Sequence, residues 1–456
     1  MTAIAAQHEH WSGRIGFLLA SIGSAVGLGN FWRFTYEAGE NGGGAFVLVY
    51  LVCVFLLITP LLLAELVIGR RGQESAAGSV AKIAREAGAT TLWRIVGIWG
   101  ILGGLLVLSF YSVIGGWVIV YIPDALAGAF SNSGKDEAEA MFGALFNDPV
   151  RMLIGHAIFM GLTIAIVLRG VRGGIETATE ILMPLLFLML IGLVIYGVYE
   201  GDFPAALDFL FAPDFAAVTP KVFLAAIGQA FFSVGVGLGL MITYGSYVGQ
   251  GINLTKAALT IAAADTAVAI LAGLAIFPIV FGSGLEAGQG PGLMFVTLPI
   301  ALGALPFGDY VGAAFFFLLF VAAITSSISL LELGVAWVAE WGLGRLRAAL
   351  VTGGVVFLVG VGAALSFNVW SDLHPFEFLP TFEGKNIFDS LDHLTADIML
   401  PVGGLLVALF AGWVLPESAA REELSDTSDG LYRLWRFLVK FVTPVAIAAI
   451  LVSNYA

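Results

Sequence analysis

Two glycine-rich stretches carry residue types that could bind a small zwitterion. The first is Gly23-Ser-Ala-Val-Gly-Leu-Gly-Asn30, and the second, Ser233-Val-Gly-Val-Gly-Leu-Gly239, has a glycine at every other position. Such spacing fits a helix poorly, because each glycine costs about 1 kcal/mol relative to alanine. A helix that unwinds there frees N–H groups, which suit a carboxylate. It also frees carbonyls, which together with Ser, Thr and Asn oxygens suit a hard cation such as Na⁺.

The same glycines could instead only allow close helix packing, since small residues are common where membrane helices touch. Their presence in two stretches, each opening a block of five hydrophobic segments, favours a binding site. Unpaired backbone groups in hydrocarbon cost several kcal/mol each, so a break is tolerated where a ligand or ion partners it.

Two acidic residues lie inside apolar segments. Asp265 is the only charged residue between Lys256 and Glu286, and Glu332 lies within the segment 309–339. A carboxylate at such a depth is costly and usually functional, with a cation as its natural partner. The sequence indicates no partner for Glu332.

The elements that must position these residues are membrane helices. Of 456 residues, 59% are hydrophobic and only 12% are charged, whereas a water-soluble protein carries about 25% charged residues. The single cysteine, Cys53, excludes an internal disulfide and a thiolate metal cluster. An enzyme is disfavoured because buried ionisable groups are few and scattered. A channel is disfavoured because no segment has a regular polar stripe.

A helix needs about 20 apolar residues to cross a bilayer. The pattern predicts eleven spans, near residues 14–37, 44–69, 95–123, 152–168, 177–199, 222–247, 257–282, 309–339, 348–366, 391–415 and 434–454. Most of the 20 Lys and Arg residues fall on the side that holds the N-terminus. The other side has Lys135, Arg151, Lys221 and Lys385. The distribution predicts a cytoplasmic N-terminus and a C-terminus outside.

We therefore expect one all-α integral membrane domain over residues 1–456, with two inverted repeats of five helices in which helices 1 and 6 are broken. The repeats would cover about 14–199 and 222–415, and an extra helix about 434–454. The outer loops at 131–150, 200–221 and 367–390 are polar and acidic. The charged segment 416–430 is predicted to be a solvated tether.

Several stretches resemble the neurotransmitter:sodium symporter family, and most closely its bacterial amino-acid transporters. They are Trp11 to Arg14, 23–34, 40–46, Gln229 to Ser233, Ile242 to Tyr247 and Thr325-Ser-Ser327. They extend from about residue 8 to about 415, and the 23–34 motif is very specific. That family is a known example of broken-helix transporters, so it does not support the broken-helix argument independently.

The resemblance implies two sodium sites. The first would use the Ala25 carbonyl, Asn30, Ser233, Asp265 and the substrate carboxylate. The second would use the carbonyls of Gly23, Val26 and Ala322 with the hydroxyls of Thr325 and Ser326. Considered alone, such hydroxyls often bond the backbone of their own helix.

The resemblance also implies a substrate site. The carboxylate would lie on the amides of Gly27, Leu28 and Gly29 and on the Tyr111 hydroxyl, and the ammonium on the carbonyls of Ala25, Phe232, Ser233 and Gly235. The wall would comprise Val107, Tyr111, Phe232, Leu238, Ser326 and Leu330, with Phe232 as a lid. Because this wall is apolar and Gly235 replaces the serine of many relatives, we expect a hydrophobic, first of all aromatic, L-amino acid. Without the resemblance, Tyr111 would be interpreted as a packed aromatic.

Relatives that need chloride have a neutral residue near the position of Asp265. Tyr50 and Gln229 match two chloride-site positions, but Ala269 stands where a hydroxyl or an acid is usual. The resemblance therefore implies that Asp265 supplies the negative charge and that chloride is not required.

The resemblance further implies gates. Arg33 and Asp392 would pair through water as an outer gate, the alternative being two residues that merely reach the interface. His8, where relatives have arginine, and Glu340 would form the inner gate. Gly174 and Pro184 would form a hinge that unwinds span 5 for release, the alternative being an ordinary kink.

The implied activity is import of the amino acid by sodium symport and alternating access in a prokaryotic inner membrane. No nucleic acid or obligate protein partner is indicated. A non-transporting amino-acid sensor on the same fold stays an alternative.

Overall fold

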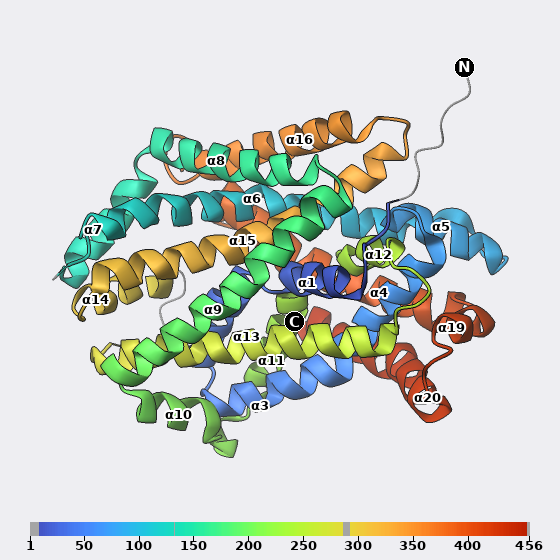
Figure 1. Cartoon of the computed structure of the whole chain (residues 1–456), viewed down its shortest axis with the longest axis horizontal. Coiled ribbons are helices and arrows are strands. Elements are labelled where there is room, and N and C mark those ends of the chain that lie inside the picture. The colour runs from blue at the N-terminus through green and yellow to red at the C-terminus, as the bar shows by residue number, and fades with distance from the viewer. Residues whose placement is uncertain (1–8, 132, 286–291, 454–456) are drawn as a thin grey trace.

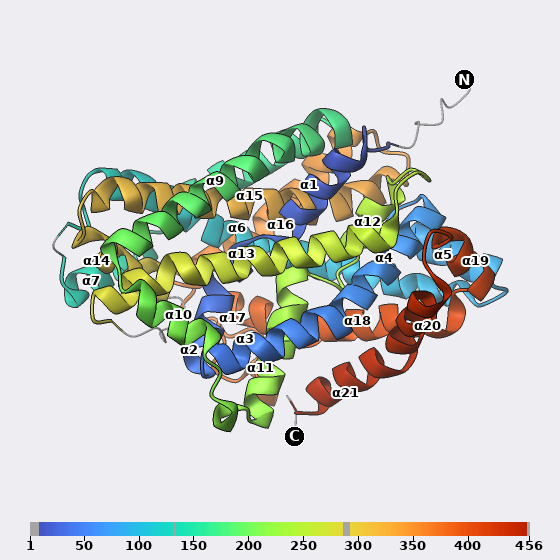
Figure 2. The same ribbon diagram turned by 60° about the horizontal axis from the view of Figure 1, so that its bottom comes forward.

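All regular elements are helices in the part of the chain that the computed structural model describes, residues 9–131, 133–285 and 292–453. Within those residues, nine helices are long and apolar enough to cross a membrane, and one bent pair makes a tenth. Figures 1 and 2 show the longest helices lying side by side along the long axis. α5 (Ala76–Glu86) and α19 (Glu417–Glu423) lie at one end of this bundle, and α7 (Lys135–Phe146) and α14 (Leu298–Gly303) lie at the other.

The long helices match nine of the predicted spans within a few residues. They are α3 to α4 (Gly44–Gly72), η3 with α6 (Thr91–Leu126), α8 (Pro149–Val167), η4 with α9 (Val171–Glu200), α13 (Leu254–Gly282), α15 (Gly308–Ala339), α16 (Arg345–Leu365), α17 to η9 (Ile387–Val414) and α20 to α21 (Asp429–Val452). The shorter helices are α5 (Ala76–Glu86), α7 (Lys135–Phe146), α10 (Phe203–Phe211), α14 (Leu298–Gly303) and α19 (Glu417–Glu423).

The first predicted span is broken. It consists of α1 (Arg14–Ala25) and a second half that begins with η1 (Gly29–Arg33) and continues as α2 (Phe34–Glu40). The two halves are bent by 51° at the break. α1 packs against α9, α13 and α15, so the break lies in the centre of the bundle.

The span predicted at 222–247 is broken as well, into α11 (Pro220–Val234) and α12 (Leu240–Ser246). Gly235, Gly237 and Gly239 between them have φ values of +69°, +95° and +74°. Glycine adopts this left-handed region freely, whereas other residues rarely do. At Gly237 a Cβ would also lie 2.5 Å from the backbone nitrogen of Gly404. Both glycine-rich stretches therefore interrupt their helices, as the sequence predicted.

The predicted outer loops are partly helical. The loop at 131–150 contains α7, which buries Ala138 and Leu145, and the loop at 200–221 contains α10. Between α13 and α15 the chain forms η6 (Leu293–Thr297) and α14, which the sequence analysis did not predict. These short helices cover one end of the bundle (Figure 1).

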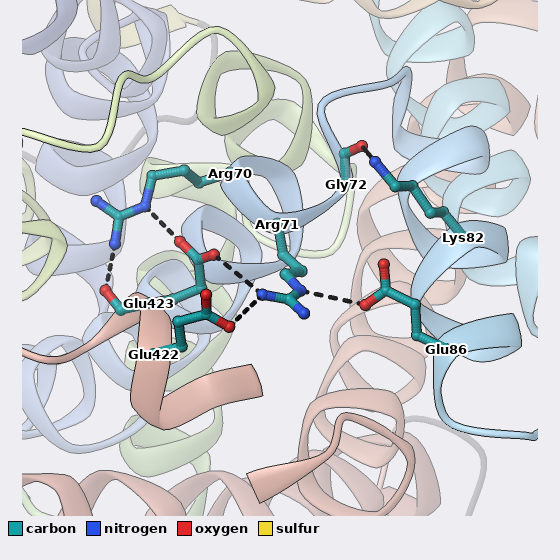
Figure 3. A network of polar contacts seen from close by, with 7 residues as sticks. All are labelled: Arg70, Arg71, Gly72, Lys82, Glu86, Glu422 and Glu423. Carbon is teal, nitrogen blue, oxygen red and sulfur yellow. Dashed lines mark hydrogen bonds and ion pairs between the residues drawn. The ribbon is translucent and has the colours of Figure 1, made fainter. Parts of the chain in front are cut away.

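The prediction that 416–430 is a solvated tether was wrong. Glu423 of α19 forms an ion pair with Arg70 at the end of α4, with 2.6 Å between Nε and Oε2 and both side chains at most 4% exposed. The next arginine, Arg71, pairs with Glu422 and with Glu86 of α5 (Figure 3). The acidic run is held against the bundle because the fold brings two arginines to it from a distant part of the chain.

Candidate substrate and ion sites

A cavity of about 60 Å³ lies between the two helix breaks, α6 and α15. Every residue that was predicted to contact the substrate lines it: Ala25, Gly27, Leu28, Gly29, Val107, Tyr111, Phe232, Ser233, Gly235, Leu238, Ser326 and Leu330. Ser24, Leu240 and Leu400 complete the wall and were not predicted. The structure therefore brings together residues from five separate parts of the chain around one mostly apolar space.

The first break places backbone amides at this cavity. The amide of Leu28 donates to the Tyr111 hydroxyl at 3.2 Å, and the amide of Gly27 donates to Asn30 Oδ1 at 2.9 Å. A Cβ on Gly27 would lie 2.7 Å from Ser326 Oγ, so the backbone approaches closely here. Tyr111 thus lies against the amides of the break and does more than fill space between helices.

The residues predicted for the first ion site form a buried polar cluster beside the cavity. Asn30 Nδ2 donates to Asp265 Oδ1 at 2.7 Å, and Ser233 Oγ donates to Asp265 Oδ2 at 2.8 Å. Asn30 Nδ2 is also 3.1 Å from Ser233 Oγ. Asp265 is fully buried, and Ala25 lines the adjoining cavity. A full charge and several oxygens at this depth are suited to a small cation.

The residues predicted for the second ion site also converge. Ser326 Oγ on α15 lies 3.0 Å from the Val26 carbonyl, 3.4 Å from that of Gly23 and 3.3 Å from that of Ala322. The Thr325 hydroxyl donates to the Ala322 carbonyl at 3.1 Å. The alternative interpretation, hydroxyls bonded to their own helix, therefore describes Thr325, whereas Ser326 also reaches across to the broken helix.

The three positions compared with a chloride site are all buried. The Tyr50 hydroxyl lies 3.4 Å from Ser233 Oγ, and Gln229 Nε2 donates to the Gly29 carbonyl at 3.0 Å. Ala269 contributes no polar group. Ser233 Oγ also donates to Asp265. The Asp265 carboxylate is therefore connected through Ser233 to Tyr50, one of the chloride-site positions, as a residue that takes the place of chloride would have to be.

Sequence reasoning missed Glu65, which holds the second break. Its side chain on α4 is fully buried, and its two oxygens accept the amides of Gly237 at 2.7 Å and Met241 at 3.1 Å. These are N–H groups that the break leaves without intrahelical partners. An acid in the apolar segment 44–69 was the available signal, by the argument that was applied to Asp265.

A larger cavity of about 410 Å³, the vestibule, adjoins the small one and shares Leu28, Gly29, Tyr111 and Phe232 with it. Arg33 and Asp392 both line it. The Arg33 guanidinium lies over the Phe232 ring at 4.6 Å and 3.8 Å from Glu37. The structure records no direct ion pair between Arg33 and Asp392, so their pairing through water stays a prediction.

At the other end of the bundle, the structure describes only one of the two residues predicted to form the inner gate, Glu340. His8 lies outside the described residues. Glu340 accepts hydrogen bonds from the amide and the hydroxyl of Ser75, which caps α5. The partner of Glu332 is found: Arg345 Nη2 is 2.7 Å from its Oε2, and the Tyr247 hydroxyl donates to its Oε1 at 2.7 Å.

The predicted release hinge is helical in this structure. Gly174 lies within η4 (Val171–Glu176), and α9 continues through Pro184 without ending there. A Cβ on Gly23 would lie 3.0 Å from the sulfur of Met183, which precedes the proline. The hinge segment therefore covers the second ion site from one side.

A multi-pass helical bundle with two broken helices around a buried polar and apolar site defines a membrane transporter. A family model, "Sodium:neurotransmitter symporter family", matches residues 8–134 and 148–456. The chain belongs to that family and is a sodium-dependent transporter of the membrane, not an enzyme.

Similar individual proteins support this family assignment. The chain is 37% identical over 447 residues to the sodium-dependent transporter YhdH of Bacillus subtilis (strain 168), an alignment that covers 97% of each chain. It is 35% identical to a sodium-dependent transporter of Haemophilus influenzae over the full length of both. Among solved structures, MhsT in complex with L-phenylalanine is similar with a TM-score of 0.88 and 43% identity, over 98% of this chain and 100% of that one.

Proposed function

We propose that this transporter imports a hydrophobic, aromatic L-amino acid together with sodium, by alternating access and without a chloride requirement. The observation that carries the proposal is the small cavity, which has backbone amides and Tyr111 at one side, an apolar wall elsewhere and the Asp265 cluster next to it. A zwitterion and its coupling ion could share such a site.

The wall supports the choice of substrate class. Among the residues that the structure describes, no Lys, Arg, Asp or Glu lines the cavity, so a charged substrate side chain would be left unpaired. Gly235 adds no side chain to this wall. The related MhsT was solved in complex with L-phenylalanine, which agrees with an aromatic substrate for this chain.

Two sodium ions are proposed to bind. The first would lie on the Ala25 carbonyl, Asn30, Ser233, Asp265 and the substrate carboxylate. The second would lie on the carbonyls of Gly23, Val26 and Ala322 with Thr325 and Ser326. The hydrogen bonds among Asn30, Ser233 and Asp265 support the first site, and the contacts of Ser326 with the Gly23, Val26 and Ala322 carbonyls support the second. Each sodium ion that moves down a 100 mV potential supplies about 2.3 kcal/mol before its concentration gradient is counted.

The transport cycle is proposed to move spans 1, 2, 6 and 7 against spans 3, 4, 8 and 9. The vestibule faces outward in this scheme, with the N-terminus inside and the C-terminus outside. Arg33, Asp392 and Phe232 would close over the substrate. Unwinding of η4 and α9 between Gly174 and Pro184 would then open a water path to the second sodium ion.

The test is uptake of labelled L-phenylalanine into proteoliposomes with an inward sodium gradient and gluconate in place of chloride. We expect uptake that vanishes when potassium replaces sodium inside and outside. A folded protein that binds L-phenylalanine but never accumulates it would contradict symport and favour the sensor alternative. Uptake that needs chloride would contradict the role given to Asp265.

Replacement of Tyr111 by phenylalanine should lower the affinity for L-phenylalanine roughly tenfold, because one hydrogen bond to a charged group contributes about 1.5–3 kcal/mol. The aromatic packing would be preserved. Equilibrium binding in sodium buffer measures the effect, and Tyr310→Phe, at an exposed tyrosine, is the matched control. Unchanged affinity in Tyr111→Phe would show that the substrate carboxylate lies elsewhere.

A further inference from the structure

A cavity of about 690 Å³ opens at the end of the bundle away from the vestibule, and three arginines line it. Arg169 lies in the connection between α8 and η4, Arg172 lies in η4, and Arg345 begins α16. The cavity is therefore placed where the ends of three membrane-crossing helices meet the segment before α1. Its other described lining residues are Glu9, His10, Leu168, Gly170 and Gly173.

Arg345 is already paired with acids, so it shapes the cavity more than it charges it. Its Nη2 lies 2.7 Å from Oε2 of the buried Glu332, and its Nη1 lies 3.1 Å from Oε1 of Glu9. Its Nε and Nη2 donate to the Val167 carbonyl, at 3.0 and 2.8 Å. These bonds hold the start of α16 against the end of α8 and thereby form one wall of the cavity.

Arg169 and Arg172 supply positive charge that is available to a ligand. Both side chains are exposed, and no acid in the described part of the chain forms an ion pair with either. Arg172 Nε donates to the His10 carbonyl at 2.7 Å, which orients the guanidinium without neutralising it. Glu9, the acid among the described lining residues, has both oxygens engaged elsewhere. Two guanidinium groups of this kind suit a phosphate, whose oxygens match their paired donors.

The cavity lies at the depth of lipid headgroups. Only residues 168–170 separate α8 from η4, and the helices on both sides of them are long and apolar enough to cross a membrane. So short a connection must stay at the bilayer surface, where the phosphates of lipids lie. The same two helices expose large apolar side chains that acyl chains would cover, among them Ile158 and Leu162 on α8 and Ile181 and Leu185 on α9.

We propose that Arg169 and Arg172 bind the phosphate of an anionic phospholipid at the inner face of the transporter. The phosphate enters the cavity, and the acyl chains follow the apolar surface of α8 and α9. The predicted orientation places this end in the cytoplasm, where basic segments meet anionic lipids. Because Arg172 is two residues from Gly174, the bound lipid would also steady the start of the release hinge. That consequence rests on the proposed function, whereas the binding itself does not.

The experiment measures by native mass spectrometry how tightly the purified transporter holds phosphatidylglycerol in detergent, with phosphatidylcholine as the neutral comparison. The parent protein should prefer phosphatidylglycerol. Arg169→Gln with Arg172→Gln should weaken its binding roughly thirtyfold, since each basic residue near the surface strengthens the attraction of an anionic lipid roughly fivefold. Arg85→Gln with Arg94→Gln removes the same charge from the same predicted side, at two exposed arginines of α5 and η3 outside the cavity. This control pair should leave the binding unchanged.

Two further variants separate the charge from the fold. Arg169→Lys with Arg172→Lys keeps both charges and should retain most of the binding, with some loss because lysine lacks the paired donors. Gly173→Asp adds a carboxylate to the cavity and should weaken the binding at least fivefold. A Cβ at Gly173 would meet no atom within 4 Å, so the protein has room for it. The midpoint of thermal unfolding in lipid-free detergent reports whether each variant is folded.

Equal binding of phosphatidylglycerol and phosphatidylcholine by the parent protein would overturn the proposal. An equal loss in the two glutamine pairs would overturn it too, because the lipid would then be attracted to the whole basic face. Inorganic phosphate that displaces the lipid at equal concentration would identify a soluble phosphate as the ligand, against the proposal. The assay contains neither amino acid nor a sodium gradient, so a failure of the proposed function leaves its result untouched.

Discussion

Asp265→Asn is expected to abolish most sodium-coupled uptake in chloride-free medium. Asp265 is fully buried and accepts hydrogen bonds from Asn30 at 2.7 Å and Ser233 at 2.8 Å. The substitution removes the negative charge that the protein itself contributes to the proposed first sodium site. It also places an amide NH₂ group opposite one of the two hydrogen-bond donors, Asn30 or Ser233. Loss of one partner of a buried charge pair costs about 3–5 kcal/mol, so the affinity for sodium should fall roughly a hundredfold or more.

The same variant tests the role of chloride. Tyr50 and Gln229 remain in place, so an external anion could take over part of the lost charge. We expect chloride to restore a measurable share of the uptake by Asp265→Asn and to have no effect on the parent protein. Sodium dependence measured in gluconate and in chloride gives both comparisons.

Asp372→Asn is the control, because Asp372 is exposed in the predicted outer loop at 367–390. It should behave as the parent does in both media. If Asp265→Asn retains the parent's sodium affinity in gluconate, the sodium ion is held by neutral oxygens alone, and Asp265 has another role.

Glu65→Gln is expected to weaken the substrate site without touching the substrate. Glu65 accepts the amides of Gly237 and Met241 with its two oxygens. Glutamine keeps one acceptor, but its NH₂ group would face one of the two donors. Hydrogen bonds to charged groups contribute about 1.5–3 kcal/mol each. Their loss should lower the affinity for L-phenylalanine roughly a hundredfold and lower the midpoint of thermal unfolding.

Substrate affinity should depend on Glu65 because the amides of Gly237 and Met241, at the second break, have no carbonyl partners within their own helix. Ser233, Gly235 and Leu238 line the cavity next to them, so a break that relaxes moves the wall. Glu40→Gln, at an exposed glutamate, provides the comparison. Parent-like affinity in Glu65→Gln would mean that other contacts, such as the close packing of Gly237 on Gly404, hold the break by themselves.

Much of the framework followed from the sequence alone. Helix count and approximate bounds depend on the length of apolar runs, which is a local property. The two breaks depend on glycine-rich runs, which are also local, and in the second break Gly235, Gly237 and Gly239 adopt positive φ. The grouping of the cavity residues came from the resemblance to a family, since no spacing argument could bring Val107 and Leu330 together.

Only the tertiary structure decided which polar groups pair. The position of Glu65 in an apolar segment marked it as a candidate functional acid, but nothing in the sequence around it indicates that its partners are the amides of the second break. Arg70 and Glu423 are 353 residues apart, and the acidic run was therefore mistaken for a solvated tether. Arg345 is only 13 residues from Glu332, yet the pairing was missed because it depends on how α16 folds back on α15. Local chain chemistry determined where helices form and break, whereas the partner of each buried charge was decided by packing between distant helices.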